Sequence, residues 1–190
     1  MTVTLKSFII AFFLLILSIC VYRFAQMQKQ EPVADLSNLP TFTASEFKGA
    51  IYDKSGLLTY KLIANNVEYY DKENKINLVK PLLEIFEYPK NKNYENWFLS
   101  GDEGFVFINK KAEVQGNVKI YPGFNHKNIK EITASKLTYD FEKDLVKSKE
   151  TVTIKGHNYL NFGSDFVADM RNNTMYYKGN PHVVYYPQKH

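Results

Sequence analysis

Residues 56–86 constrain the fold most, because they alternate apolar and polar side chains on both sides of a polar turn. The alternation runs from 58 to 70 and restarts once, after Asn65-Asn66. The segment DKENK at 71–75 has no apolar residue and is rich in turn formers, so it predicts a chain reversal. Pro81 interrupts the returning strand and cannot donate to a β-ladder, which predicts an edge strand or a bulge there. The stretch therefore predicts a β-hairpin.

The same hairpin pattern recurs three more times along the chain. Each copy opens on a small residue, has a second marked residue three positions later, and then reaches a polar turn (71–74, 109–111, 142–144 and 171–174). The opening residues and their companions are Ala64 and Val67, Gly101 and Gly104, Ala134 and Leu137, and Gly163 and Phe166. The openings are 37, 33 and 29 residues apart, which is too uneven for a strict solenoid but fits a meander of hairpins.

The pattern after residue 40 predicts an all-β domain, because no apolar stripe with a helical period is sustained there. Roughly fourteen or fifteen short strands, or fewer and longer ones, would build a sandwich or a jelly roll. Gly56, in a turn, is expected to have a positive φ. Gly156 is expected either to have a positive φ or to allow a close approach.

The N-terminus predicts a membrane anchor at residues 1–25 and a flexible tether at 26–40, ahead of the β domain at 41–190. Sixteen uncharged residues separate Lys6 from Arg23. As a helix they would span about 24 Å, against a bilayer core of about 30 Å, and the flanking cations can extend the match. The anchor face would comprise Phe8, Phe12, Leu15, Ile19 and Tyr22.

Two other interpretations of this segment, a cleaved signal peptide and a lipoprotein signal, fit the sequence less well. A cleaved signal peptide cut after Ala25 would place Arg23 where a small residue is needed. A lipoprotein signal ending at Cys20 would have the bulky Ile19 beside the cut. The balance of positive charges on the two sides does not decide the orientation of the anchor.

Composition argues against several classes of function. The net charge is +4 with basic and acidic residues interspersed, so no basic face for nucleic acid is visible. A single cysteine excludes an internal disulfide. No two of the four histidines have metal-ligand spacing, and no nucleotide-binding or nucleophile motif is present. We therefore expect neither an enzyme, nor a metal, nor a cofactor.

The segment GLLTYKLIA at 56–64, the run VEYY at 67–70 and Pro81 resemble the LptC family, a bitopic inner-membrane component of the lipopolysaccharide export system. The resemblance implies a single transmembrane helix followed by a twisted, open β-jellyroll of repeated hairpins. It implies location in the cell inner membrane, with the amino end cytoplasmic and the β domain periplasmic. It also implies three partners: lipopolysaccharide, the LptB/LptF/LptG transporter and the periplasmic bridge protein LptA.

A carrier of this kind must hide acyl chains, since each CH₂ group left in water costs about 0.8 kcal/mol. The period of two along the strands selects the inward side chains as groove candidates. Phe47 is added because it matches the position at which the family's ligand enters. The candidates are Phe47, Tyr60, Leu62, Leu78, Ile85, Val106, Ile120, Tyr139 and Ile154. The alternative is that these side chains form a closed core.

The first and last strands are expected to pair with neighbouring proteins through their open edges. The first strand, at 41–52, would meet the transporter. The last would meet LptA through Met175, Tyr177, Val183 and Tyr185. Two rival functions stay open: a membrane-tethered β-sandwich for protein interaction or adhesion, and a carbohydrate-active enzyme, which would need paired carboxylates that the sequence does not indicate.

Overall fold

The computed structural model describes residues 22–23, 39–89, 94–126, 128–172 and 174–186. The chain divides into two units, 1–39 and 40–190, which are taken separately. In the first unit Tyr22 and Arg23 are helical. Among the described residues, no helix has the length and apolar character needed to cross a bilayer. The predicted anchor positions Phe8, Phe12, Leu15 and Ile19 lie outside these residues, as does nearly all of the predicted tether.

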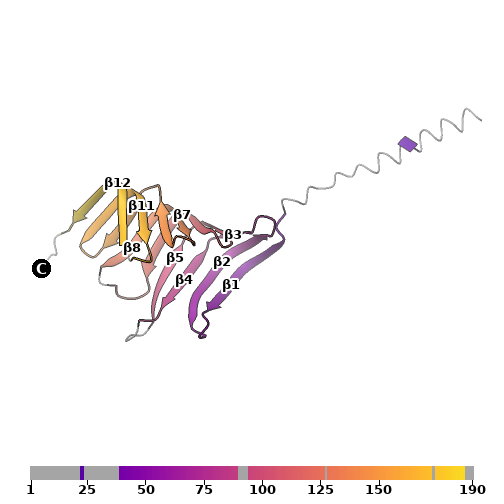
Figure 1. The fold of residues 1–190 in the computed structure, drawn as a ribbon, viewed down its shortest axis with the longest axis horizontal. Coiled ribbons are helices and arrows are strands. Elements are labelled where there is room, and N and C mark those ends of the chain that lie inside the picture. The colour runs from indigo at the N-terminus through magenta and orange to yellow at the C-terminus, as the bar shows by residue number, and fades with distance from the viewer. Residues whose placement is uncertain (1–21, 24–38, 90–93, 127, 173, 187–190) are drawn as a thin grey trace, which may run out of the picture. The chain divides into compact units, whose positions relative to one another are not determined.

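Residues 40–190 form one antiparallel sheet, in which the described residues contribute twelve strands (Figure 1). The all-β prediction is therefore confirmed. The strands are β1 (Phe42–Tyr52), β2 (Leu58–Tyr70), β3 (Lys75–Val79), β4 (Leu82–Glu87), β5 (Glu95–Ser100), β6 (Glu103–Phe107), β7 (Lys111–Pro122), β8 (Ile129–Asp140), β9 (Leu145–Ser148), β10 (Val152–Gly156), β11 (Tyr159–Asp169) and β12 (Thr174–Tyr185).

Six long strands lie in three adjacent pairs, β1–β2, β7–β8 and β11–β12, and short strands lie end to end between these pairs. Both β3 and β4 pair with β2, both β5 and β6 pair with β7, and β9 and β10 each pair with β8 and β11. The strands lie side by side from β1 to β12 (Figure 1). The larger of the two strand estimates, roughly fourteen or fifteen, is wrong, because several long strands run through positions that resemble breaks in the sequence.

A line of irregular residues crosses the middle of the sheet, and we call it the corner. It is marked by five non-glycine residues with positive φ, Glu46, Lys80, Asn117, Asp165 and Asn180. The strand register shifts at the corner between β7 and β8 and between β11 and β12. A register shift of this kind marks a β-bulge, in which one strand has an extra residue, and β-bulges bend a sheet.

The small residues of the sequence repeat lie beside this corner. In β2, Ala64 and Val67 are 1% and 7% exposed, and Asn65-Asn66 between them lie at the bend. The equivalent residues of the other copies are also buried, except Gly101, which is half-buried. The small residues of the sequence repeat thus mark the position of the bend, and the repeat as a whole corresponds to a series of hairpins.

Pro81 lies in the break between β3 and β4, next to Lys80 with its positive φ of 51°. Both strands have neighbours on each side, so an interruption rather than an edge position accommodates the proline. On the same stretch of the corner, the Lys80 ammonium lies 2.5 Å from Asp102, and the Asn117 amide donates to the same carboxylate at 2.7 Å. These two hydrogen bonds lower the pKa of Asp102.

The predicted polar turns lie between strands along one rim of the sheet. Backbone hydrogen bonds join neighbouring turns: Ile108 N–H donates to Asn74, Phe141 N–H to Lys110, and Met170 N–H to Asp144, at 2.9, 3.0 and 3.1 Å. The rim is therefore tied together independently of the strand ladders.

Two apolar clusters fill the inside of the bend. The larger joins Val118, Ala134, Leu137, Val152, Ile154 and Phe166, which come from both sides of the corner. The smaller joins Ala64, Val67 and Leu78. Because the larger cluster contains residues from both halves of the sheet, the inward faces of the two halves pack on one another near the corner.

Candidate functional site: the inward face of the sheet

An aliphatic row crosses the inward face of the sheet from β1 to β12. Each member is the register partner of the next, so all of them point to the same face. The row runs Gly49, Leu62, Leu83, Leu99, Ile120, Ile132, Ile154, Asn161 and Val183. Six consecutive members are leucine or isoleucine.

A second row lies on the other side of the corner, close to the joined turns. Its members are also successive register partners. The row runs Phe42, Tyr69, Ile76, Val106, Ala112, Tyr139, Val146, Ala168 and Met175. The two rows give the inward face apolar walls on both halves of the sheet.

All nine groove candidates from the sequence lie on this inward face. Leu62, Ile120 and Ile154 belong to the aliphatic row, and Val106 and Tyr139 belong to the second row. Tyr60 pairs with Ile85, Phe47 with Ala64, and Leu78 with Val67.

The candidates differ in exposure. Ile154 and Leu78, at 2% and 8% exposed, are part of the packed clusters, as the closed-core alternative requires of them. Tyr60 is 41% exposed, and the other six are half-buried. Apolar side chains are thus least covered away from the corner, where a ligand could reach them.

Tyr139 connects the inward face to the rim. Its hydroxyl donates to Asp144 Oδ1 in the next turn, at 2.5 Å, and its ring packs edge-on against Phe141 at 5.4 Å. The hydrogen bond to Asp144, followed by burial and the charge of Asp144, raises the pKa of Tyr139 to about 12.

The outward face has a different chemistry. Glu113 lies between two lysine ammoniums, 2.6 Å from Lys111 and 2.7 Å from Lys136. The hydrogen bonds from these lysines lower the pKa of the Glu113 carboxyl. Lys75 lies over the rings of Phe105 and Phe107, at 5.4 and 5.9 Å. Aromatic rings on this face are therefore partly covered by cations.

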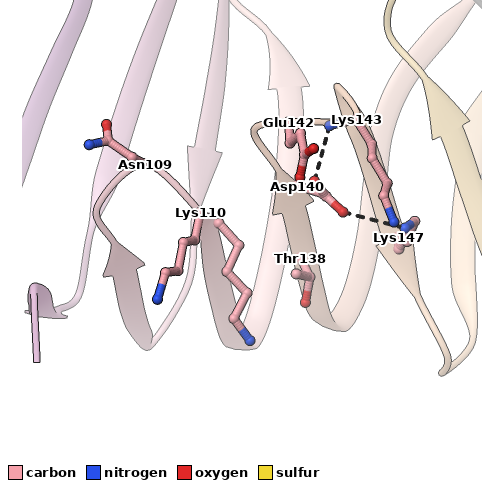
Figure 2. A pocket seen from close by; sticks show the side chains of 8 residues that line it. Asn109, Lys110, Thr138, Asp140, Glu142, Lys143 and Lys147 are labelled. Atoms are coloured by element: carbon pink, nitrogen blue, oxygen red, sulfur yellow. Dashed lines mark hydrogen bonds and ion pairs between the residues drawn. The ribbon is translucent and has the colours of Figure 1, made fainter.

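A surface hollow of about 420 Å³ lies beside the turn that precedes β7 (Figure 2). Its lining is Asn109, Lys110, Lys111, Thr138, Asp140, Glu142, Lys143 and Lys147. Asp140 accepts a hydrogen bond from the Lys143 N–H at 3.1 Å and lies 3.7 Å from the Lys147 ammonium. Every lining side chain is polar or charged and the hollow is open to solvent, so it gives an acyl chain little shelter from water. No cluster of three or more potential metal ligands occurs in the part of the chain that the structure describes.

Within the described part of the chain, the two outer strands, β1 and β12, each have one pairing partner, so both present an open edge. Of the predicted edge residues, Met175, Val183 and Tyr185 are 51%, 49% and 76% exposed. Tyr177 is half-buried, with its ring 5.2 Å from that of Phe166.

The two predicted glycines have different environments. Gly56 has a φ of 83°, as predicted for its turn, and Asp53 caps that turn by accepting from the Ser55 and Leu57 N–H groups at 2.8 and 2.9 Å. Gly156 has no positive φ. The ring of Tyr159 lies so close that a Cβ atom on Gly156 would clash with it.

Sequence reasoning missed several members of the inward face. Leu83, Leu99 and Ile132 complete the aliphatic row. The spacing of two between Leu83 and the candidate Ile85 could have identified Leu83. Asn161 was missed because a polar residue gives no apolar signal.

These features define an all-β protein built on one bent antiparallel sheet, with an apolar inward face and, among the described residues, two open edges. The chain belongs to the lipopolysaccharide-assembly, LptC-related family, whose profile matches residues 8–185. It is 23% identical over 135 residues to the lipopolysaccharide export system protein LptC of Escherichia coli strain K12, which covers 71% of this chain and 69% of that protein. The Shigella flexneri protein of the same name matches equally well.

Proposed function

We propose that this chain is a non-enzymatic carrier that takes part in lipopolysaccharide export, holding the acyl chains of its ligand against the inward face of the sheet. The observation that carries the proposal is the aliphatic row, in which six successive register partners are leucine or isoleucine and point to the same face. Family membership supports the choice of ligand.

The energetics favour such a site. Exposing an acyl chain of ten CH₂ groups to water costs roughly 8 kcal/mol of free energy, at about 0.8 kcal/mol per group. The half-buried side chains away from the corner can cover that chain, while the packed clusters near the corner hold the two halves together. In this proposal the bent sheet is a twisted jellyroll that stays open opposite its corner.

The open edges supply the route of transfer in this proposal. β1 receives lipopolysaccharide from the LptB/LptF/LptG transporter, and β12 passes it to LptA by strand pairing. The N-terminal segment anchors the protein in the inner membrane, with the β domain in the periplasm. The transporter supplies the energy, so the chain itself needs neither a cofactor nor a metal.

Two adjacent leucines provide a matched test. Leu83 belongs to the aliphatic row and Leu82 points outward, and both are half-buried. The full chain would be purified in mild detergent with lipopolysaccharide, and the retained lipid measured by mass spectrometry. We expect Leu83→Lys to lose most of the bound lipid and Leu82→Lys to keep it. Equal retention by both variants, or no lipid on the unaltered chain, would refute the carrier function and favour a protein-interaction module.

A further inference from the structure

Two polar atoms at the β11–β12 end of the inward face are buried without a hydrogen-bond partner in the described structure. They are Asn161 Oδ1 and the Tyr177 hydroxyl oxygen. Buried polar groups are nearly always paired, and an unpaired one costs stability. Two such groups on one apolar face therefore call for an explanation beyond packing.

Asn161 interrupts an otherwise apolar surface. Its register partners are Ile154 on one side and Val183 on the other. The row reaches Asn161 after six aliphatic side chains, so a ligand lying along the row would meet its first polar side chain here.

Tyr177 reaches the same region from β12. Its ring crosses Gly163, where a Cβ atom would lie 2.9 Å from the ring. Gly163 is two residues from Asn161 in β11, so both face inward as neighbours. Burial, followed by the proximity of Tyr159, raises the pKa of Tyr177 to about 12, so the hydroxyl is neutral at physiological pH.

We propose that Asn161 and Tyr177 form a polar subsite that hydrogen-bonds a neutral hydroxyl, ester or amide group carried on an otherwise apolar acyl ligand. This inference rests on the carrier function proposed above and adds where the ligand's polar linkages are held. The Tyr177 hydroxyl donates to a carbonyl or hydroxyl oxygen, and Asn161 Oδ1 accepts from a hydroxyl or amide hydrogen. A plain hydrocarbon chain would gain nothing from either group.

The subsite also gives the groove a direction. Acyl chains lie along the aliphatic row, and their polar linkages are held beside β12, next to the open edge. A ligand arranged in this way presents its polar junction first at the edge through which transfer is proposed.

The test uses variants that remove polar atoms and retain most of the side-chain volume. Tyr177→Phe and Asn161→Leu would each be made in the full chain, with Tyr176→Phe, an outward tyrosine that is 46% exposed, as the control. Two quantities are measured: lipopolysaccharide retained per chain by mass spectrometry, and the melting temperature of the lipid-free protein. We expect about a fivefold loss of retained lipid for each variant, as removal of one hydrogen bond gives. The melting temperature should stay the same or rise, because an unpaired buried group is removed.

Three results would overturn the inference. Unchanged lipid retention with an equal or higher melting temperature would mean that the polar atoms are only a packing defect. Unchanged retention with a lower melting temperature would mean that they hold a structural water. A loss of retention that Tyr176→Phe shares would mean that the effect is not specific to the inward face. If the unaltered chain retains no lipid, the carrier function itself fails, which is a different result from failure of the subsite alone.

Discussion

Ala64 and Val67 both point to the inside of the sheet although they are three positions apart, because the corner of β2 lies between them. In a regular strand, residues three apart lie on opposite faces. The pair therefore reports the bend directly, and the tight space around Ala64, which is 1% exposed, is a requirement of that bend.

Enlarging Ala64 should destabilise the corner. We expect Ala64→Leu to lower the free energy of unfolding by about 1–3 kcal/mol, since overfilling a packed site forces neighbouring groups apart. Ala50→Leu, on the exposed surface of β1, should change it by less than about 0.5 kcal/mol. Urea denaturation of the full chain in detergent measures both, and equal effects would show that the space at Ala64 is unimportant.

Much of the fold was predictable because it repeats. Small residues at Ala64, Gly101, Ala134 and Gly163, each with a partner three positions later, are a local signal that recurs in four copies. The bend that this spacing produces was not predictable, since positive φ at Glu46, Lys80 or Asp165 leaves little trace in those residue types. The larger strand estimate was too high because several long strands run through positions that resemble breaks in the sequence.

The candidate site was predictable on one point and not on another. Alternation placed the eight groove candidates other than Phe47 on one face, because a period of two is a property of every strand. Alternation could not distinguish Tyr60, which is 41% exposed, from Ile154, which is 2% exposed, because burial depends on how the two halves pack. Tyr177 was expected to be available at the open edge, and its partial burial depends on the Phe166 ring that packs against it.

Substitution of Gly56 should destabilise the protein through backbone strain alone. Its φ is 83°, and a Cβ atom would meet nothing within 4 Å. Gly56→Val should therefore lower the free energy of unfolding by about 1–2 kcal/mol, and Gly56→Asn by less than half of that, because asparagine tolerates positive φ. Thermal unfolding of the two variants compares them. An equal cost for both would mean that the turn does not hold Gly56 in this conformation.

Glu113 should make stability depend on pH. Its folded-state pKa is below the usual 4.5, so its contribution is present above that pH and is lost as the pH falls through the lowered value. Glu113→Gln should cost about 1 kcal/mol at pH 7 and almost nothing at low pH. Glu131→Gln, whose carboxylate is 3.9 Å from Lys119, is the control and should have little effect. If Glu113→Gln lowers the free energy of unfolding equally in acid and at neutral pH, the charged Glu113 carboxylate is not the source of the stabilisation.

The two open edges should be separable by mutation. Lysines at Val183 and Tyr185, which are 49% and 76% exposed, should weaken binding of LptA and spare the transporter. Lysines at Ile51 and Tyr52, which are 60% and 61% exposed, should do the reverse. Co-purification of each partner with the full chain measures both. Loss of both partners from either double variant would argue against separate edges.

The central claim is that the ligand touches the inward face and not the outward one. Tyr60 and Ile63 lie on the same strand, are 41% and 43% exposed, and point to opposite faces. A photo-crosslinking amino acid placed at each position in turn, in the full chain in membranes that contain lipopolysaccharide, tests the claim directly. We predict a lipopolysaccharide adduct at position 60 and almost none at position 63; equal adducts at both, or an adduct at 63 alone, would contradict it.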